Sequence, residues 1–470
     1  MRRERTLILR ANQHAQLRQH LFPGDGKEAA AVVLCTRQRV GEQLKFLART
    51  VLLVPYDECE RFRDRLQWPG GYLDAALEAA KADDLSIFLV HSHPSGYPDF
   101  SKLDDESDAE VMPSLFLASV DVAVHDGRWH GSAIMLPTGE LCARTYDQEC
   151  KPRAVELVAI YGDNLQFYWH DCLNPSAQRP MAFTSAMTEE LGRLHAVIVG
   201  VSGTGSIVAE QLLRMGFGEI TVIDFDHIED KNLNRILNST AADAELKRLK
   251  VASFKRAAQA IRPSTEINAV SLSIGVPQAV ELAAAGDILF SCVDTETGRH
   301  MCDRLAAAML QPLFDVGVSL PVESSRRGKV LSNVAVRTDY VQPGGVTLFD
   351  RKIYTSKGLA AEDLRARDPA AFERQATEGY MPGSGEHAPS VICVNMLGAS
   401  RLVLDFVARA YPYRVDGNHT FAHYQDDQVG NDIDRRAEDA FLARPFDVLA
   451  CGLNAPLLGL SELEDRRCGL

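Results

Sequence analysis

The sequence predicts an α/β protein of two domains, the second built on a mainly parallel sheet. Its 470 residues exceed what one hydrophobic core usually serves. Short apolar runs mix with a helical stretch in the N-terminal third, and after residue 180 a strand, a glycine turn, a helix and a second strand follow one another. We expect domains over residues 1–145 and 181–425, a connector over 146–180, and a C-terminal tail of unassigned role over 426–470.

The apolar runs locate the elements of both domains. In the first domain, the runs and an alanine-rich helical stretch lie at Ala29–Cys35, Val51–Val54, Leu73–Lys81 and Ile87–Val90. The second domain opens with a strand, a helix and a strand at Ala196–Val199, Ser206–Met215 and Ile220–Ile223. A strand, helix and strand in this order predict a parallel sheet. The charged stretch 357–380 is predicted as a solvated helical insertion.

The composition excludes several classes of protein. With 46% hydrophobic and 24% charged residues, it is typical of a globular protein. No stretch reaches the roughly 18 uncharged apolar residues of a membrane span, and the apolar stretch after MRRERTLILR is too short for a signal peptide. A net charge of -14 argues against a general nucleic-acid binder. We therefore expect a cytoplasmic protein with no membrane or nucleic-acid partner.

A candidate metal site follows the strand Ile87–Val90, in the stretch HSHPSGYPDFSKLD. His91 and His93 lie two residues apart at the strand end, so their side chains point to the same side. Asp104 returns from the next loop or helix. Two imidazoles and one carboxylate leave the fourth position of Zn²⁺ to water, which is the arrangement of a catalytic zinc.

Hydrolysis at such a site also needs a base and a donor to the oxyanion. Glu28 and Ser101 can fill these roles, and Asp25 and Glu42 are weaker rivals for the base. The pattern H-x-H-x7-S-x2-D, with Glu28 opening an upstream strand, resembles the JAB/JAMM metalloprotease family. The resemblance implies a JAB/MPN-like domain that removes ubiquitin-like modifiers or trims their C-terminal tails.

A second candidate site lies in the turn GVSGTGS, at residues 200–206. Its glycines Gly200, Gly203 and Gly205 allow a close approach to phosphate, and the following helix offers free N–H groups. Asp224, about 20 residues on, can accept a ribose hydroxyl. Alone, this fingerprint would also suit a Rossmann dehydrogenase.

The later polar residues favour adenylation over hydride transfer. Asn232, Arg235 and Lys250 offer donors for a triphosphate, and Asp294 can hold Mg²⁺. The segments GVSGTGS, VIDFD, NLNR, the Lys250 helix and SCVDTETGR resemble the superfamily of ThiF, MoeB and ubiquitin-activating enzymes. The resemblance implies a Rossmann-like fold and ATP. It places ribose at Asp224, phosphates at Asn232, Arg235 and Lys250, and magnesium at Asp294, with Arg299 supporting that loop.

The sequence departs from that superfamily in three ways. It lacks paired C-x-x-C motifs, and ahead of the first strand of this domain it offers only Arg179 for a contact across a dimer. No cysteine follows the stretch VQPGGVTLF until Cys393, the candidate for a thioester. The apolar run SVICVNML favours a buried core thiol there, as for Cys292 and Cys302. Cys468 is expected to be more exposed, and the pair His419 and His423 is predicted as a solvated surface feature.

Together the resemblances imply a bifunctional enzyme of a bacterial ubiquitin-like pathway, of the kind linked to phage defence. Its zinc site would cleave after the modifier's C-terminal glycine, and its second site would adenylate that glycine. The implied partners are a small ubiquitin-like protein ending in glycine, a conjugating enzyme, and a second copy bound through the ThiF-like domain. Two alternatives stay open: activation of a sulfur carrier for thiocarboxylate synthesis, and a scaffold with one inactive domain.

Overall fold

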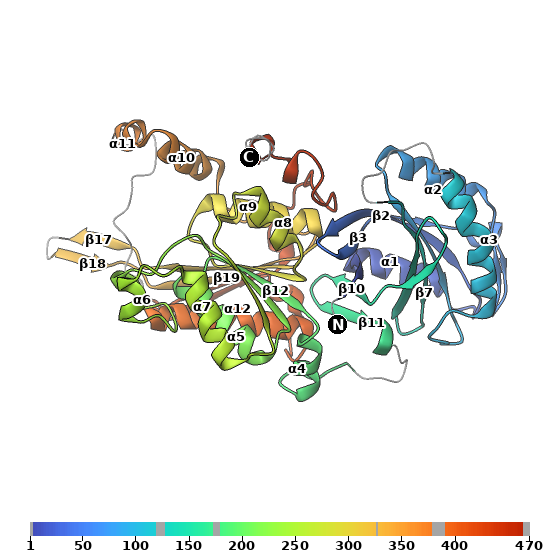
Figure 1. Cartoon of the computed structure of the whole chain (residues 1–470), viewed down its shortest axis with the longest axis horizontal. Helices are drawn as coiled ribbons and strands as arrows, with labels where there is room; N and C mark the ends of the chain where they lie inside the picture. The colour runs from blue at the N-terminus through green and yellow to red at the C-terminus, as the bar shows by residue number, and fades with distance from the viewer. Residues whose placement is uncertain (1–2, 119–126, 173–178, 326–327, 378–390, 464–470) are drawn as a thin grey trace. The chain divides into compact units, whose positions relative to one another are not determined.

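The computed structural model describes residues 3–118, 127–172, 179–325, 328–377 and 391–463 (Figure 1). Its internal contacts divide the chain into two units. The first unit contains Met1–Arg179 with the short segments Ala308–Leu310 and Val448–Asn454, and the second contains the rest. Each unit is built on one large sheet.

The sheet of the first unit has nine strands in the order β11-β10-β1-β3-β2-β6-β7-β8-β9. Three neighbouring pairs, β1 with β10, β1 with β3 and β6 with β7, are parallel, and the other five are antiparallel. The strands are β1 (Arg5–Arg10), β2 (Ala30–Val40), β3 (Gln43–Leu53), β6 (Ser86–Ser92), β7 (His130–Met135), β8 (Leu141–Tyr146), β9 (Pro152–Ala154), β10 (Leu157–Tyr161) and β11 (Leu165–Trp169). A separate two-stranded ribbon joins β4 (Glu60–Arg61) and β5 (Leu66–Gln67).

Helices cover both faces of this sheet, as alternate residues of β2 show. Ala31, Val33 and Cys35 pack in one apolar cluster with Leu17 and Leu21 of α1 (Ala11–Leu21). Val32 and Leu34 pack in another with the buried residues of α2 (Gly71–Ala82) and α3 (Lys102–Ala118). Successive side chains of a strand point to opposite faces, so β2 is buried on both.

The eight-stranded sheet of the second unit has the order β14-β13-β12-β15-β16-β19-β20-β21, and its first five strands are parallel. Their bounds, followed by those of the three antiparallel strands, are β12 (His195–Val199), β13 (Glu219–Ile223), β14 (Glu266–Val270), β15 (Ile288–Ser291), β16 (Leu313–Ser319), β19 (Ala335–Val341), β20 (His423–Asp427) and β21 (Asp432–Arg436). All five residues of β12 are buried, as expected for a central parallel strand between helical layers.

In the second unit, α5 (Gly203–Met215), α7 (Lys250–Ile261) and α12 (Ile392–Ala410) lie on one side of the sheet, and α8 (Pro277–Ala284) and α9 (Glu296–Met309) lie on the other (Figure 1). The remaining elements are α4 (Ser185–Leu191), α6 (Ala241–Glu245), the ribbon of β17 (Val322–Ser325) with β18 (Gly328–Leu331), α10 (Ser356–Arg367) and α11 (Pro369–Thr377). The predicted α/β class and the parallel core of the second domain are confirmed.

The predicted connector over 146–180 differs from the structure. Residues 157–161 form β10, which is fully buried. It pairs in parallel with β1, the first strand of the chain. The short strands β9, β10 and β11 show no clear periodicity because each has five residues or fewer. The predicted tail over 426–470 also begins inside the sheet, since β21 pairs with β20. The helical insertion predicted over 357–380 is present as α10 and α11 up to residue 377, and residues 378–380 lie outside the described part of the chain.

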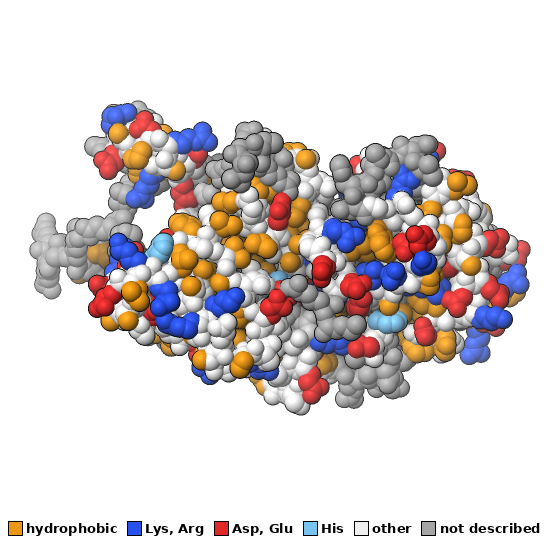
Figure 2. Space-filling model, in the orientation of Figure 1, with side chains coloured by type: hydrophobic (Ala, Val, Ile, Leu, Met, Phe, Trp, Pro, Cys, Tyr) orange, Lys and Arg blue, Asp and Glu red, His pale blue; other side chains and the backbone are white. Residues whose placement is uncertain are grey.

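Among the described residues, no helix has both the length and the apolar character that a membrane crossing requires. Lys and Arg side chains lie among Asp and Glu side chains on the face that Figure 2 shows.

Candidate functional sites

The histidine pair lies at the carboxyl end of β6. His91 is opposite Ala30 of β2 and opposite Ile134 of β7, so neighbouring strands hold it from both sides. The backbone N–H of His93 donates to the carbonyl of Met135 at 2.9 Å. His91 therefore stands on an interior strand of the large sheet, and His93 directly follows that strand.

Asp104 reaches the histidines from the first turn of α3. Its Oδ1 lies 3.0 Å from Nε2 of His91 and its Oδ2 lies 3.3 Å from Nε2 of His93. The two Nε2 atoms are 3.1 Å apart. One ligand atom from each of the three residues lies within 4.8 Å of the others. Burial alone would raise the pKa of Asp104, but the hydrogen bonds from His91 and His93 hold it well below its usual range.

The donor set fits zinc. Nδ1 of His93 lies 2.9 Å from the carbonyl oxygen of Tyr97. Because a carbonyl can only accept, Nδ1 carries the proton and Nε2 is left with a lone pair that faces the other ligands. Two imidazoles and one carboxylate on one side of the ion leave a coordination position open. The predicted ligands His91, His93 and Asp104 are therefore brought together.

Glu28 lies just before β2, beside this cluster. Its side chain is 7% exposed, its N–H donates to the carbonyl of Phe62 at 2.8 Å, and its own carbonyl accepts from Nε of Arg61 at 2.7 Å. Burial raises the pKa of Glu28 to about 7; the charge of His93 opposes this rise and that of Asp104 adds to it. A carboxyl group that titrates near neutrality suits a general base.

The two rivals of Glu28 lie in different surroundings. The carboxylate of Asp25 accepts from Nη1 of Arg61 at 2.8 Å and is part of an exposed turn. Glu42 is exposed in the turn between β2 and β3, at the end of β2 that is remote from His91. Of the three carboxyl groups, Glu28 is the one whose pKa responds to the charges of His93 and Asp104.

Ser101 caps the helix that carries Asp104. Its N–H donates to Oδ2 of Asp104 at 2.6 Å, and its Oγ accepts from the N–H of Asp104 at 3.2 Å. An accepting hydroxyl keeps its own hydrogen for donation. Ser101 can therefore fix Asp104 and still donate to a developing oxyanion.

The glycine turn of the second unit lies between β12 and α5. Gly200 has φ +87°, a conformation that favours glycine. A Cβ on Gly205 would lie 1.7 Å from the carbonyl oxygen of Gly200, and one on Gly203 would lie 2.2 Å from Nδ2 of Asn395. Backbone contacts therefore require glycine at Gly200 and Gly205, whereas the contact at Gly203 is with a side chain that can move. The turn brings the first N–H groups of α5 to the sheet edge.

Asp224 and Lys250 meet at the end of the neighbouring strand. Asp224 follows β13, and its Oδ2 accepts from the N–H of Val201 in the glycine turn at 2.7 Å. Nζ of Lys250, at the start of α7, donates to Oδ2 of Asp226 at 2.7 Å and lies 3.6 Å from Oδ2 of Asp224. Burial raises the pKa of Asp224, and Lys250 opposes the rise.

The other predicted residues surround the same sheet edge. The Cδ of Arg235 would lie 3.2 Å from a Cβ on Gly203, so this side chain lies against the turn. Asn232 is buried, and its Oδ1 accepts from the N–H of Glu229 at 3.0 Å. Asp294 is exposed in the loop after β15, two residues beyond Cys292, whose carbonyl packs against Gly200.

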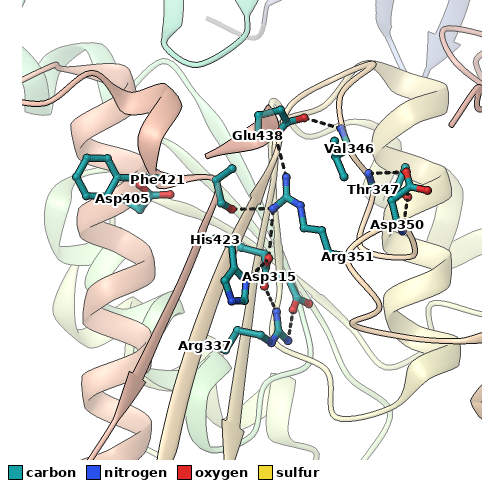
Figure 3. A network of polar contacts seen from close by, with 12 residues as sticks. Asp315, Arg337, Val346, Thr347, Asp350, Arg351, Asp405, Phe421, His423 and Glu438 are labelled. Atoms are coloured by element: carbon teal, nitrogen blue, oxygen red, sulfur yellow. Dashed lines mark hydrogen bonds and ion pairs between the residues drawn. The ribbon is translucent and has the colours of Figure 1, made fainter. Parts of the chain in front are cut away.

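A buried ionic network around Asp315, which was not predicted from the sequence, contacts this loop through Arg299. Figure 3 shows its Asp315, Arg337 and His423 side chains. Arg299 donates to the carbonyl of Val293 at 2.8 Å and pairs with Asp315 at 3.5 Å. Asp315 also accepts from Ser291 at 2.6 Å and from Arg337 at 2.7 Å. The predicted support from Arg299 is thus part of a larger structure. The only sequence signal is the charge pair of Arg337 and Asp339 within the apolar strand β19.

The network continues away from the loop. Arg337 pairs with Asp339, and Oδ1 of Asp339 lies 2.9 Å from Nδ1 of His423. His423 is buried, so the prediction of a solvated histidine pair is wrong for this residue and right for the exposed His419. The turn residues around His423 suggested exposure, but β20 carries it into the sheet.

The three cysteines predicted to be core thiols differ in burial. Cys292 and Cys302 are buried, and burial raises the pKa of both thiols far above the ordinary value. Cys393 is exposed in the first turn of α12, so the expectation of a core thiol is wrong. The apolar run is divided between the two faces of an amphipathic helix. Cys468 lies outside the described residues. Arg179 is exposed, with its guanidinium 6.0 Å from the ring centroid of Tyr168.

Two family models match the chain. Prokaryotic homologs of the JAB domain match residues 10–132, and the ThiF family matches residues 176–342. The first match contains the three predicted zinc ligands, and the second contains the glycine turn and Asp294.

Curated relatives match this chain over only part of their own length. A molybdopterin-synthase adenylyltransferase of Haemophilus influenzae is 31% identical over 29% of this chain and 54% of its own. Ubiquitin-like modifier-activating enzyme 5 of Culex quinquefasciatus is 25% identical over 42% of this chain and 49% of its own. A sulfur carrier protein adenylyltransferase of Thermus thermophilus is 27% identical over 27% and 45%. The chain thus spans about half the length of these relatives.

Among solved structures, the Microcin C7 biosynthetic enzyme MccB in complex with N-formylated MccA covers 57% of this chain and 70% of its own at 17% identity, with a TM-score of 0.43. By the two family models, residues 10–132 are similar to the prokaryotic homologs of the JAB domain and residues 176–342 are similar to the ThiF family.

Proposed function

We propose that the protein is a bifunctional enzyme acting on the C-terminal glycine of a small ubiquitin-like protein. The first unit would hydrolyse the peptide or isopeptide bond after that glycine, and the second would adenylate the glycine with ATP. The observation that carries the proposal is the meeting of His91, His93 and Asp104 within 4.8 Å, beside a buried Glu28.

In the first unit, His91, His93 and Asp104 would hold zinc. When bound, the metal would lower the pKa of a water molecule and polarise the scissile carbonyl. Glu28 takes the proton of the attacking water, and its pKa of about 7 allows it to pass that proton on to the leaving amine. The hydroxyl of Ser101 donates to the oxyanion.

In the second unit, the substrates are the modifier's terminal carboxylate and ATP. Asp224 accepts from a ribose hydroxyl, and Arg235, Lys250 and Asn232 donate to the phosphates. A carboxylate oxygen attacks the α-phosphorus, forming the acyl-adenylate and releasing pyrophosphate. Asp294 would hold magnesium, which screens the negative charges as they approach. Lys250 would leave Asp226 for the phosphates when nucleotide enters.

Cys393 bears on the fate of the adenylate. Its exposure in the first turn of α12 supports a thioester there, from which a conjugating enzyme would receive the modifier. The neighbouring Asn395 packs against Gly203, so this turn of α12 lies beside the glycine turn. The second candidate function is sulfur-carrier activation without a thioester, as the name of the Thermus thermophilus relative suggests.

The cellular setting belongs to the same proposal. We expect a cytoplasmic protein of a bacterial modifier system, with a role in phage defence, that forms a homodimer through its second unit. Apolar side chains on α12 support the homodimer, because Met396, Leu397 and Leu404 are each at least 40% exposed.

The proposal is tested with purified protein and a panel of small ubiquitin-like proteins ending in glycine. Cleavage of C-terminal fusions should require zinc, and modifier-dependent exchange of pyrophosphate into ATP should require magnesium but not zinc. Metal analysis and nucleotide titration address the alternative of a scaffold with one inactive domain. Absence of both activities across the panel would refute the proposal.

A further inference from the structure

The candidate zinc ligands lie on two elements, β6 and α3, that are anchored to the first unit by different contacts. His91 and His93 belong to or directly follow an interior strand, whereas Asp104 lies on a helix that must be docked separately. Of the ten residues 101–110, only Asp108 is buried. The apolar anchors of α3 are Met112, Leu115 and Phe116, in its second half. Apolar packing therefore does not hold the half that carries Asp104.

Pro113 lies directly after the first of these anchors, Met112. A proline inside a helix has no N–H to donate to the carbonyl four residues earlier, here that of Ala109. One backbone hydrogen bond of α3 is therefore missing where its first half joins the apolar anchors.

Asp108 lies one turn after Asp104, on the same face of α3. Its Oδ2 accepts from four donors: Oγ of Ser132 at 2.5 Å, the hydroxyl of Tyr146 at 2.7 Å, and Nη2 and Nε of Arg144 at 2.7 and 3.0 Å. We call Asp108, Ser132, Arg144 and Tyr146 the Asp108 clamp. It ties the first half of α3 to β7 and β8.

Arg144 also holds the chain on the other side of Asp104. Its guanidinium carbon lies 3.8 Å from the ring centroid of Phe100, the residue before Ser101. Ser101 in turn exchanges hydrogen bonds with Asp104. One side chain thus contacts both the loop that enters α3 and the turn that follows the ligand.

We propose that the Asp108 clamp positions Asp104 for zinc without touching the metal, and that Asp108 and Arg144 are its positioning residues. The inference rests on the proposed zinc site. Arg144 and Tyr146 lie beyond residues 10–132, the part matched by the JAB model. The position of the Asp104 side chain therefore depends on β8, a strand that lies outside the family match.

The test compares Asp108→Asn with the matched control Asp105→Asn. Asp105 is an exposed partner of the same Arg144, through Nη1 at 2.5 Å, but contacts neither Ser132 nor Tyr146. Zinc affinity is measured by competition with a chromogenic chelator. Loss of a supporting contact behind a ligand typically costs roughly 10- to 100-fold in metal affinity, which we expect for Asp108→Asn. For Asp105→Asn we expect a change of less than about threefold, as for exposed pairs.

Amide hydrogen exchange of the zinc-free full-length protein gives a second readout. Asp108→Asn should speed exchange in the first two turns of α3 and leave β6 unchanged, whereas Asp105→Asn should change neither. If Asp108→Asn does not fold, two milder variants replace it. Tyr146→Phe removes one hydrogen-bond donor to Asp108, and Arg144→Lys removes the paired guanidinium hydrogen bonds while keeping the positive charge. Both should give smaller changes in the same direction.

The possible failures are distinguishable. Wild-type protein that binds no zinc would overturn both the proposed hydrolase and the clamp. Wild-type protein that binds zinc, with clamp variants that match it in affinity and in exchange, would overturn the clamp alone. Faster exchange throughout the first unit, rather than in the first half of α3, would identify Asp108 as a general stabiliser and also refute the positioning role.

Discussion

Replacing Gly205 by alanine should disable the second site while leaving the first intact. The added Cβ would lie 1.7 Å from the carbonyl oxygen of Gly200 and 3.1 Å from the Cβ of Cys292. Ordinary contacts begin near 3.4 Å, so α5 and the glycine turn must separate by roughly 1.7 Å along that direction. The oxygen belongs to the backbone, and no rotamer change can relieve the contact.

This displacement moves the N–H groups that would contact the phosphates. A misplacement of about 1 Å can cost on the order of 100-fold in rate. We expect Gly205→Ala to lower modifier-dependent pyrophosphate exchange by at least about that factor and to weaken ATP binding in a titration. Zinc affinity and cleavage of the modifier fusion should stay at wild-type values, because both belong to the other unit.

Gly71→Ala is the matched control. Gly71 opens α2, and a Cβ there would meet nothing within 4 Å. It should leave both activities unchanged. Circular dichroism and thermal unfolding establish that Gly205→Ala is folded at the assay temperature. A folded Gly205→Ala protein that binds ATP and exchanges pyrophosphate within about threefold of wild type would refute the reasoning about the turn.

Three further predictions concern single groups. Glu28→Gln should retain zinc and lower cleavage by about 10²- to 10⁴-fold. The wild-type rate should rise as pH passes about 7, where the Glu28 carboxyl loses its proton, and a rise of equal size in the variant would contradict this role. Burial raises the pKa of Asp303 from 3.8 to about 7, so wild-type stability should fall, relative to Asp303→Asn, as pH rises from about 4 to 7. The free energy of unfolding, measured with urea, should fall by at most roughly 4 kcal/mol relative to the variant. If the stabilities of the two proteins changed in parallel with pH, this prediction would be refuted. Cys393→Ala should leave pyrophosphate exchange intact and abolish any thioester trapped on non-reducing gels, whereas an unchanged thioester would place the acceptor elsewhere.

The cluster of candidate metal ligands could be predicted from the sequence because its members are close together in the chain. His91, His93 and Asp104 follow one another along a strand, a loop and a helix, so their spacing fixes their geometry. Glu28 is harder, since its position depends on the register that pairs Ala30 with His91. No spacing rule gives that register, and only burial and neighbouring charge separate Glu28 from Asp25 and Glu42.

In the second unit, topology provides what spacing does not. The ends of adjacent parallel strands meet at one edge of the sheet, so residues after β12, β13 and β15 converge there although they lie far apart in sequence. This rule predicts Gly200, Asp224 and Asp294 together. It cannot predict the ionic network behind them, because Asp315 and Arg337 pair across antiparallel strands whose order the sequence does not reveal.

The buried network has a further consequence for the loop of Asp294. Asp315 is fully buried and is paired with Arg337 and Arg299. Removing one partner of a buried ion pair leaves an uncompensated charge, which typically costs about 3–5 kcal/mol. The loop can therefore tolerate changes at the exposed Asp294 far better than changes at Asp315. Replacing Asp294, which would bind magnesium, should therefore cost little stability, whereas replacing Asp315 or its arginine partners should cost much. A screen for stability alone would point to the network and miss the proposed magnesium ligand.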